Sequence, residues 1–224
     1  DNDSQSIGGV EEPPKVNKDL LLTSYIFDCL AISLSLFYIG YLFFMATLVC
    51  SILSKAYSHP RIRLKKNPFL SWLTVSIFQG PFIYLAIFLS FSSSWPIDLK
   101  QQWPAALSTA FLFGGAYPMT QIFQHEEDRK RGDETLSLKL GIKGTFLFSA
   151  MSFLIGTLLL FYYQFINKKF EVFYIFPLFM LPTFIYFSYW FFLCLRNESE
   201  VNFRNCMKLN IISTLCFCSF FIFI

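Results

Sequence analysis

The sequence has little charge for its length. Only 15% of its 224 residues are charged and 54% are hydrophobic, which lies outside the range of ordinary soluble domains. Its six cysteines show no metal-ligand spacing, so they predict neither a zinc site nor a disulfide framework. The short alternating segments of an outer-membrane barrel are absent as well. A net charge of only +3 gives no reason to expect a nucleic-acid partner.

Long apolar runs are the main feature of the chain. They recur from Leu20 to the last residue, and each is long enough to cross the roughly 30 Å hydrocarbon layer as a helix. We therefore predict an all-α polytopic membrane protein, a bundle of seven visible transmembrane helices in a single domain over residues 1–224. The predicted spans are residues 20–37, 39–54, 69–92, 104–124, 144–166, 172–195 and 207–224.

The basic residues are distributed unevenly about these spans. Fifteen of the 18 Lys and Arg residues fall in the N-terminal tail and in alternate connections, and such an excess marks the cytoplasmic side of a membrane protein. We expect a multi-pass protein of the cell (inner) membrane, surrounded by membrane lipid, whose active site faces the cytoplasm. No protein partner is inferred.

Acidic residues collect in two segments on this same side. Asp1 and Asp3 lie in the N-terminal segment 1–19, and Asp128 lies in the segment 124–143. Carboxylates clustered with water and substrate phosphates are how Mg²⁺ is usually held in proteins. If both segments face one cavity, they are expected to bind Mg²⁺ ions that a diphosphate bridges.

A stripe of polar residues runs along the end of the fourth predicted span. Its members recur every three or four residues and so share one helical face; they are Tyr117, Thr120, Gln121, Gln124 and Asp128. Such a stripe is expected to face a protein cavity and not lipid. The alternative is a helix end that simply enters the headgroup region, but the stripe begins about three turns before the charged loop.

A basic loop, residues 55–68, lies on the same side and reads KAYSHPRIRLKKNP. By itself this charge is typical of a positive-inside loop attracted to anionic lipid. Beside two acidic segments, a clamp on a diphosphate is the better interpretation, because Arg forks and Lys point charges suit phosphate oxygens.

Asp28 is the one acid well inside a predicted span. An intramembrane carboxylate is a functional candidate by default, here as a catalytic base at the acceptor site. The alternative is a residue near the interface that is hydrogen-bonded to a neighbouring helix.

Three segments together carry a family resemblance. YSHPRIRLK (57–65) resembles the Y-S-x-P-P-x-R-x-K signature of the UbiA superfamily of intramembrane aromatic prenyltransferases, and QHEEDRKRGDETLSLKLG (124–141) resembles that family's second acidic motif. DNDSQS (1–6) resembles the end of its first acidic motif. The resemblance implies a nine-helix UbiA-type fold that here lacks helix 1 and most of helix 2.

The resemblance also implies roles for particular residues. It assigns catalytic roles to Asp128 and Asp1, diphosphate binding to Arg63, Lys65, Arg61, Arg129 and Tyr57, and Mg²⁺ binding to Asp1, Asp3, Gln124, Glu127 and Asp128. Gln5 and Gln124 stand where the family commonly has aspartate, and Arg61 replaces the second proline. Glutamine can ligate through its carbonyl but brings no charge, so the exact ligand set stays open, with Glu127 or Asp133 as compensating acids.

The implied reaction is Mg²⁺-dependent transfer of a polyprenyl group from an allylic diphosphate to a lipophilic acceptor within the membrane. Cleavage of the allylic C–O bond leaves a delocalised cation and a highly charged leaving group, which bound cations would neutralise. The aromatic faces of Tyr57 and Tyr117 are candidates to steady the carbocation. Neither the acceptor nor the prenyl length follows from the sequence.

Two other functions are weighed against this one. A CDP-alcohol phosphotransferase also binds metal and diphosphate at a membrane face, but its D-G-x-x-A-R…G…D…D signature is absent. A non-enzymatic transporter usually places ionisable residues near mid-membrane in several spans, whereas Asp28 stands nearly alone.

Overall fold

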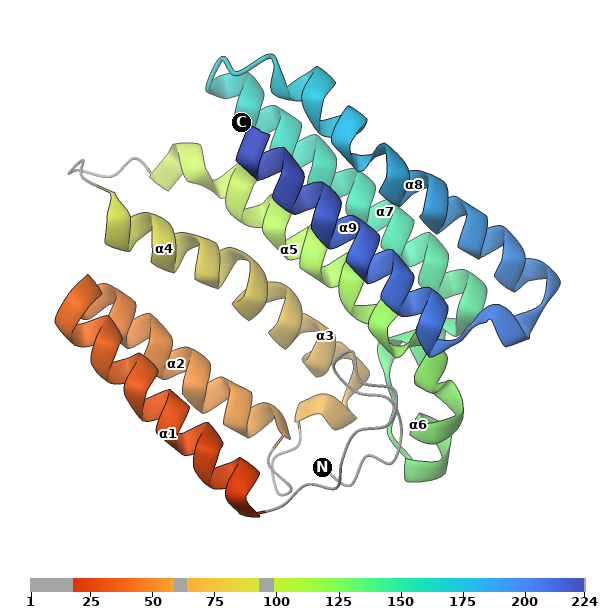
Figure 1. The fold of residues 1–224 in the computed structure, drawn as a ribbon, viewed down its shortest axis with the longest axis horizontal. Coiled ribbons are helices and arrows are strands. Elements are labelled where there is room, and N and C mark those ends of the chain that lie inside the picture. The colour runs from red at the N-terminus through yellow and green to blue at the C-terminus, as the bar shows by residue number, and fades with distance from the viewer. Residues whose placement is uncertain (1–17, 59–63, 93–98, 224) are drawn as a thin grey trace.

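The computed structural model describes residues 18–58, 64–92 and 99–223. Within these ranges the chain forms helices and connecting turns, with no strand, and the long helical segments number seven (Figure 1). They are α1 (Lys18–Leu34), α2 (Tyr41–Ser58), α3 (Pro68–Ile77) continued by α4 (Ile83–Phe91), α5 (Leu99–Gln121), α7 (Leu136–Ile166), α8 (Val172–Arg196) and α9 (Phe203–Phe223). They follow the order of the predicted spans, and the predicted all-α fold is confirmed.

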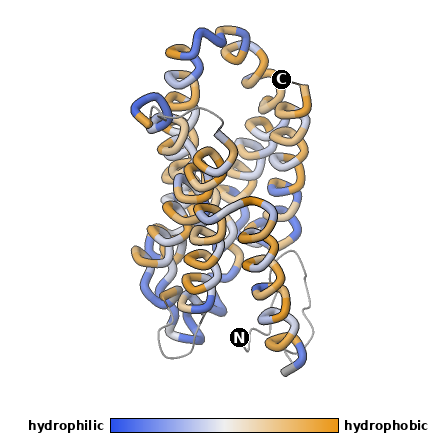
Figure 2. The backbone as a smooth tube through the Cα atoms, turned by 90° about the vertical axis from the view of Figure 1, so that its left-hand side faces the viewer, coloured by the Kyte–Doolittle hydropathy of each residue, from blue (hydrophilic) through white to orange (hydrophobic). Residues whose placement is uncertain are grey.

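Most of these segments are apolar enough to span a membrane. Within the described residues, five helices meet the length and hydropathy expected of a span, and α2 is apolar but shorter. Hydrophilic residues gather toward the ends of the bundle, and the stretches between them are mostly hydrophobic (Figure 2). The chain is therefore a multi-pass membrane protein.

Helix α5 is less apolar than the others, and its position gives the reason. Gln102, Ser108 and Gln121 are among its buried residues. It packs against α3 on one side and most extensively against α7 on the other. Neighbouring helices therefore shield part of α5 from lipid, and large apolar side chains such as Leu107 and Phe113 occupy its exposed face.

Small residues allow α5 and α7 to approach each other closely. A Cβ atom on Gly115 of α5 would lie only 2.8 Å from the Cβ of Ser152 in α7. The hydroxyl of Ser108 donates a hydrogen bond of 2.7 Å to the backbone carbonyl of Gly156. Small residues and interhelical hydrogen bonds are the usual means of helix association in a bilayer, where burial away from water gives no driving force.

The predicted span 69–92 is a bent helix. A π-helical turn (Phe78–Phe82) separates α3 from α4, and Gly80 within it has a non-helical φ of −93° and ψ of −106°. A Cβ atom on Gly80 would lie 2.9 Å from the backbone nitrogen of Ala110 in α5. At the bend, the backbone of this span therefore lies in close contact with the backbone of α5.

A tight connection joins α1 to α2, at the boundary between the first two predicted spans. It consists of a π-helical turn (Ser35–Ile39) and Gly40, whose φ of +133° is a conformation that suits glycine. The resulting hairpin lies at one side of the bundle, with α2 against α4 (Figure 1). Large apolar side chains of α1 are exposed, as at Phe27 with 66% of its surface, as expected of a helix in contact with lipid.

An aromatic cluster holds the end of α5 against α7, α8 and α9. Phe146 of α7 contacts Trp190 of α8, with ring centroids 5.1 Å apart. The indole N–H of Trp190 donates to the carbonyl of Glu200, between α8 and α9, at 2.8 Å. Met119 and Ile122 are buried in the same cluster. The chain therefore leaves α5 at a well-packed point, and the acidic motif follows directly.

Candidate functional site

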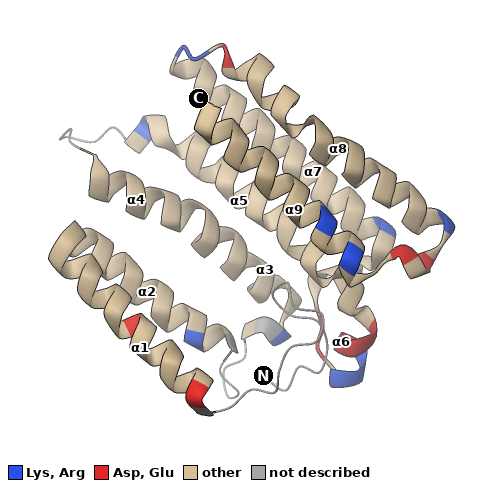
Figure 3. Ribbon diagram, viewed as in Figure 1, with Lys and Arg blue, Asp and Glu red and all other residues tan. Residues whose placement is uncertain are grey.

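Charged residues lie toward the two ends of the bundle, and one end carries the second acidic motif (Figure 3). This motif forms α6 (His125–Arg131), which follows α5 after a 3-10 turn (Ile122–Gln124). Acidic residues occupy the first turn of α6 and basic residues its last turn, an arrangement that suits the helix dipole. Gly132 ends the helix in the left-handed conformation, with φ of +67°.

Asp128 is buried and held in one orientation. Its Oδ2 accepts a hydrogen bond of 3.0 Å from the Thr135 hydroxyl, and only 9% of the residue is exposed. Thr135 is also the N-cap of α7, where its side chain accepts from the N–H of Leu138 at 3.3 Å. The N–H of Asp133 donates to the carbonyl of Asp128 at 2.9 Å. The α6–α7 loop therefore fixes both the backbone and the carboxylate of Asp128.

Glu127 is buried beside it but is paired within α6. Its carboxylate accepts a hydrogen bond from the Arg131 guanidinium one turn later, the spacing at which helical side chains meet. This pairing competes with the Mg²⁺ role predicted for Glu127. Arg129, a predicted diphosphate ligand, is exposed on the same short helix.

His125 connects α6 to α7 through a chain of side-chain contacts. Its Nε2 lies 2.7 Å from the Oγ of Ser137, which lies 3.0 Å from the Oγ1 of Thr145. Thr145 donates to the carbonyl of Gly141 at 2.7 Å. Burial, together with the nearby charge of Arg129, lowers the pKa of His125 below its ordinary value. These two effects favour the neutral imidazole.

The predicted polar stripe is half-buried or buried along its whole length. Helix α5 ends at Gln121, so Gln124 and Asp128 lie on the turn and on α6, and the expected continuous helix to residue 124 is wrong at its last turn. The Oε1 of Gln121 is buried and has no hydrogen-bond partner within the described part of the chain. A buried amide oxygen without a donor is costly, and a cation or a substrate donor would relieve that cost.

Two tyrosines connect the helix that enters the basic loop to the polar stripe. The hydroxyl of Tyr57, in the last turn of α2, is hydrogen-bonded to the hydroxyl of Tyr117 in α5. Both side chains are half-buried. The contact places the start of loop 55–68 against the face of α5 that carries the stripe.

Asp28 lies between α1 and α2. Its carboxylate forms an ion pair with Lys55 and accepts a hydrogen bond of 3.3 Å from Ser51. The Lys55 ammonium also lies over the ring of Tyr25, 4.7 Å from its centroid. These contacts correspond to the alternative in which Asp28 is bonded to a neighbouring helix, and its catalytic role stays a prediction.

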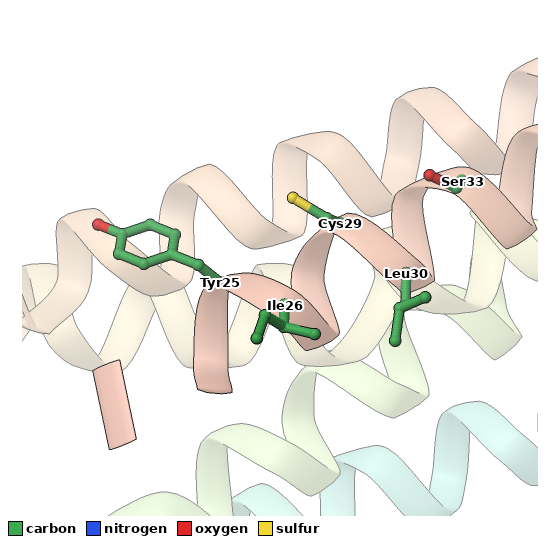
Figure 4. Close-up of a pocket in the computed structure, with 5 residues that line it drawn as sticks. All are labelled: Tyr25, Ile26, Cys29, Leu30 and Ser33. Atoms are coloured by element: carbon green, nitrogen blue, oxygen red, sulfur yellow. The ribbon is translucent and has the colours of Figure 1, made fainter. Parts of the chain in front are cut away.

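A shallow hollow lies along the exposed face of α1 (Figure 4). Its volume is about 320 Å³, and its lining residues all belong to α1: Tyr25, Ile26, Cys29, Leu30 and Ser33. It shares no residue with α6 or with the polar stripe, so we do not include it in the candidate site.

Several predicted site residues lie outside the described residues. These are Asp1, Asp3, Arg61 and Arg63, together with Gln5. The backbone of Lys65 forms part of a 3-10 turn (Leu64–Lys66), but its side chain is not among those described. The meeting of the two acidic segments therefore stays a prediction.

The oxygen donors near α6 suit the Mg²⁺ ion that the resemblance implies. Within the described ranges, no group of three or more His, Cys, Asp or Glu side chains could hold a metal ion. The carboxylate of Asp128 and the amide oxygens of Gln121 and Gln124 are nevertheless hard ligands of the kind Mg²⁺ prefers, and Mg²⁺ commonly completes its shell with water and phosphate. The buried, unsatisfied oxygen of Gln121 fits this use. These residues can supply one part of a Mg²⁺ site.

No role was predicted from the sequence for His125, Ser137, Thr135 or Arg131. Thr135 before an apolar run is a recognisable N-cap signal, and the spacing of Glu127 and Arg131 is a recognisable helical pair. No local pattern indicates the contact between His125 and Ser137, because it depends on how α6 folds back onto α7.

The fold and this end of the bundle define a class of protein. One end of a bundle of apolar helices carries the buried carboxylate of Asp128, which Thr135 orients, and the hydrogen-bonded hydroxyls of Tyr57 and Tyr117. Such an arrangement suits an integral membrane enzyme whose substrate joins a charged head to an apolar tail.

The family follows from comparison with known proteins. The model of the UbiA prenyltransferase family matches residues 16–212. Because this match covers most of the chain, the protein belongs to the UbiA prenyltransferase family. No curated protein and no solved structure matches the chain significantly. The protein is thus a membrane prenyltransferase by family, and membership favours this class over the phosphotransferase and transporter alternatives.

Proposed function

We propose that this protein transfers a polyprenyl group from an allylic diphosphate to a lipophilic acceptor within the membrane, and binds the diphosphate with Mg²⁺ at the α6 end. One observation carries the proposal beyond the family, namely the hydrogen bond between Tyr57 and Tyr117. Through it, the helix that enters the basic loop meets the helix that leads into the acidic motif. Basic groups for the diphosphate and oxygen ligands for Mg²⁺ would thus reach one site from two directions.

Asp128 and Gln124 are the proposed Mg²⁺ ligands from the second motif, and Asp1 and Asp3 those from the first. Glu127 is a weaker candidate because Arg131 already engages its carboxylate. When bound, Mg²⁺ supplies positive charge that stabilises the departing diphosphate. Thr135 orients the Asp128 carboxylate before the substrate arrives, as supporting hydrogen bonds do at metal sites.

Basic residues are proposed to bind the diphosphate directly. Arg61, Arg63, Lys65 and Arg129 would donate hydrogen bonds to phosphate oxygens and offset the charge that develops as the C–O bond breaks. Tyr57 would add a hydroxyl donor or an aromatic face near the allylic cation.

The apolar helices account for the remaining requirements of the reaction. They exclude water, so that the acceptor and not water captures the allylic carbon, and they admit a lipid-soluble acceptor from the bilayer. The acceptor must lose a proton after attack, and Asp28 remains the candidate base. We further propose that the α6 end faces the cytoplasm of a cell membrane, because the excess of Lys and Arg lies on that side.

Binding of farnesyl diphosphate tests the proposal. The purified protein is expected to bind this probe only with Mg²⁺ present. Asp128→Asn should weaken binding by about tenfold or more, the usual cost of losing a metal ligand or its support. Glu171→Gln, an exposed acid beside α8, is the matched control and should bind like the wild type. Binding without Mg²⁺, or unchanged affinity in Asp128→Asn, would refute the assigned site.

A further inference from the structure

We infer that His125 is a positioning residue, whose hydrogen bond to Ser137 holds α6 against the start of α7 and so keeps Asp128 oriented for Mg²⁺ and diphosphate. This inference rests on the proposed function, which assigns Asp128 to the substrate site. His125 is not proposed to touch the substrate. It acts through the position of α6.

Helix α6 needs such support because it is short. It contains seven residues, and isolated helices of fewer than about 12 residues are only marginally stable in water. Two contacts attach it to the start of α7: His125 to Ser137, and Asp128 to Thr135. Residues 125 and 128 are three apart and so lie on one face of α6. Loss of the His125 contact would therefore weaken the attachment of α6 to the start of α7.

The direction of the hydrogen bonds follows from counting protons. Thr145 has one hydroxyl proton, and its closest acceptor is the Gly141 carbonyl at 2.7 Å. The contact of 3.0 Å between Ser137 and Thr145 must then use the Ser137 proton. The Ser137 oxygen is left as an acceptor, so the Nε2–H of His125 donates to it. With a neutral imidazole protonated at Nε2, each of these hydrogen bonds between His125, Ser137 and Thr145 has one donor and one acceptor.

The series of hydrogen bonds from His125 to Thr145 also spans a break in α7. Gly141 has φ of +67° and ψ of +179°, a region that is essentially restricted to glycine. The break separates the first turn of α7, which carries Ser137, from the long part that carries Thr145. The contacts from His125 to Thr145 therefore link α6, the first turn of α7 and the membrane-embedded part of α7.

Two variants remove the contact from either side. His125→Phe keeps a ring of similar size but has no donor, and Ser137→Ala removes the acceptor. His125→Gln is the rescue variant because its amide can donate to Ser137. Ser149→Ala is the matched control, since Ser149 is fully buried in α7 and its hydroxyl has no hydrogen-bond partner within the described residues.

Hydrogen–deuterium exchange of α6 and affinity for farnesyl diphosphate with Mg²⁺ are the two measurements. His125→Phe and Ser137→Ala should each speed exchange in α6 and weaken farnesyl diphosphate binding by about fivefold, the equivalent of one hydrogen bond. The double variant should be no worse than Ser137→Ala alone, because that variant already removes the contact with His125. His125→Gln should recover part of the loss, and Ser149→Ala should show none.

Unchanged α6 exchange in both single variants would overturn the inference, as would additive losses in the double variant. If the wild-type protein binds no farnesyl diphosphate with Mg²⁺, the proposed function fails. The exchange measurement still decides in that case whether His125 positions α6.

Discussion

The α1–α2 hairpin and the α5–α7 pair are both contacts between membrane helices, but they are built by different means. Polar side chains join α1 to α2, through the ion pair of Asp28 with Lys55, while apolar side chains of α1 remain exposed. Helices α5 and α7 instead meet through small residues such as Gly115 and Ser152 at nearly backbone distance. An ion pair joins the first pair of helices, whereas close packing of small residues, with a hydrogen bond from Ser108, joins the second.

This difference matters because α5 and α7 flank the acidic motif. Helix α6 follows the end of α5 and precedes the start of α7. A change in the packing of α5 against α7 is therefore expected to affect the position of Asp128. The hairpin carries no residue of that motif and contacts the polar stripe through Tyr57.

The largest expected effect comes from a change in the close packing. Gly115→Val would force side-chain atoms into Ser152, and overpacking of this kind costs about 1–3 kcal/mol. We expect a clear loss of thermal stability in detergent, together with weaker farnesyl diphosphate binding. Ala150→Val, at an exposed position of α7, is the control and should melt near the wild-type temperature. Equal melting of the two variants would contradict the proposed difference between the regions.

A smaller effect is expected from the polar contact of the hairpin. Asp28→Asn or Lys55→Met leaves a charge of the pair without its partner, and each should lower stability by about 1–2 kcal/mol, less than a fully buried pair would lose because both side chains are partly exposed. The double variant should recover most of this loss.

Activity of the same double variant decides the role of Asp28. If the role of Asp28 is structural, the double variant should regain prenyl transfer together with stability. Persistent loss of transfer in a stably folded double variant would instead support the prediction that Asp28 is the acceptor base.

The smallest effect is expected at an exposed ion pair in the aqueous end. Lys139 donates to the Glu134 carboxylate at 2.9 Å, and this hydrogen bond lowers the pKa of Glu134. A depressed carboxyl pKa contributes stability above its unfolded value, and the contribution is lost as pH falls through the folded value. Lys139→Met should therefore raise the pKa of Glu134, measured by carboxyl NMR titration, with almost no change in melting temperature. A large change in melting temperature would show that the exposed pair of Lys139 with Glu134 stabilises the protein as much as the pair of Lys55 with Asp28.

Much of the fold could be predicted because bilayer thickness and apolar runs set the spans. The helix starts were less predictable. Helix α5 begins at Leu99, earlier than expected, because buried packing against α7 lets a helix with polar residues extend. Helix α7 begins at Leu136 and not near residue 144, because the Thr135 N-cap starts a turn before the break at Gly141.

The candidate site could be predicted as a set of residue types, whose roles stay predictions, but not as a set of contacts. Asp128, Gln124 and Tyr57 follow from motif positions. The engagement of Glu127 by Arg131 and of Asp28 by Lys55 depends on which of several basic groups a carboxylate meets in space. The contact of His125 with Ser137 depends on the reversal of the chain after Gly132, whose exact path no short pattern encodes.

The backbone at Gly141 has a consequence for how members of such a family can diverge. In an uninterrupted helix, one inserted residue rotates every later side chain by about 100°. An insertion among residues 136–140 would then carry Ser152 and Gly156 away from α5. The helix is interrupted at Gly141, so a change in the length of segment 136–140 can be absorbed there. The end of the protein that binds the charged head of the substrate can then change while Ser152 and Gly156 keep their positions against α5.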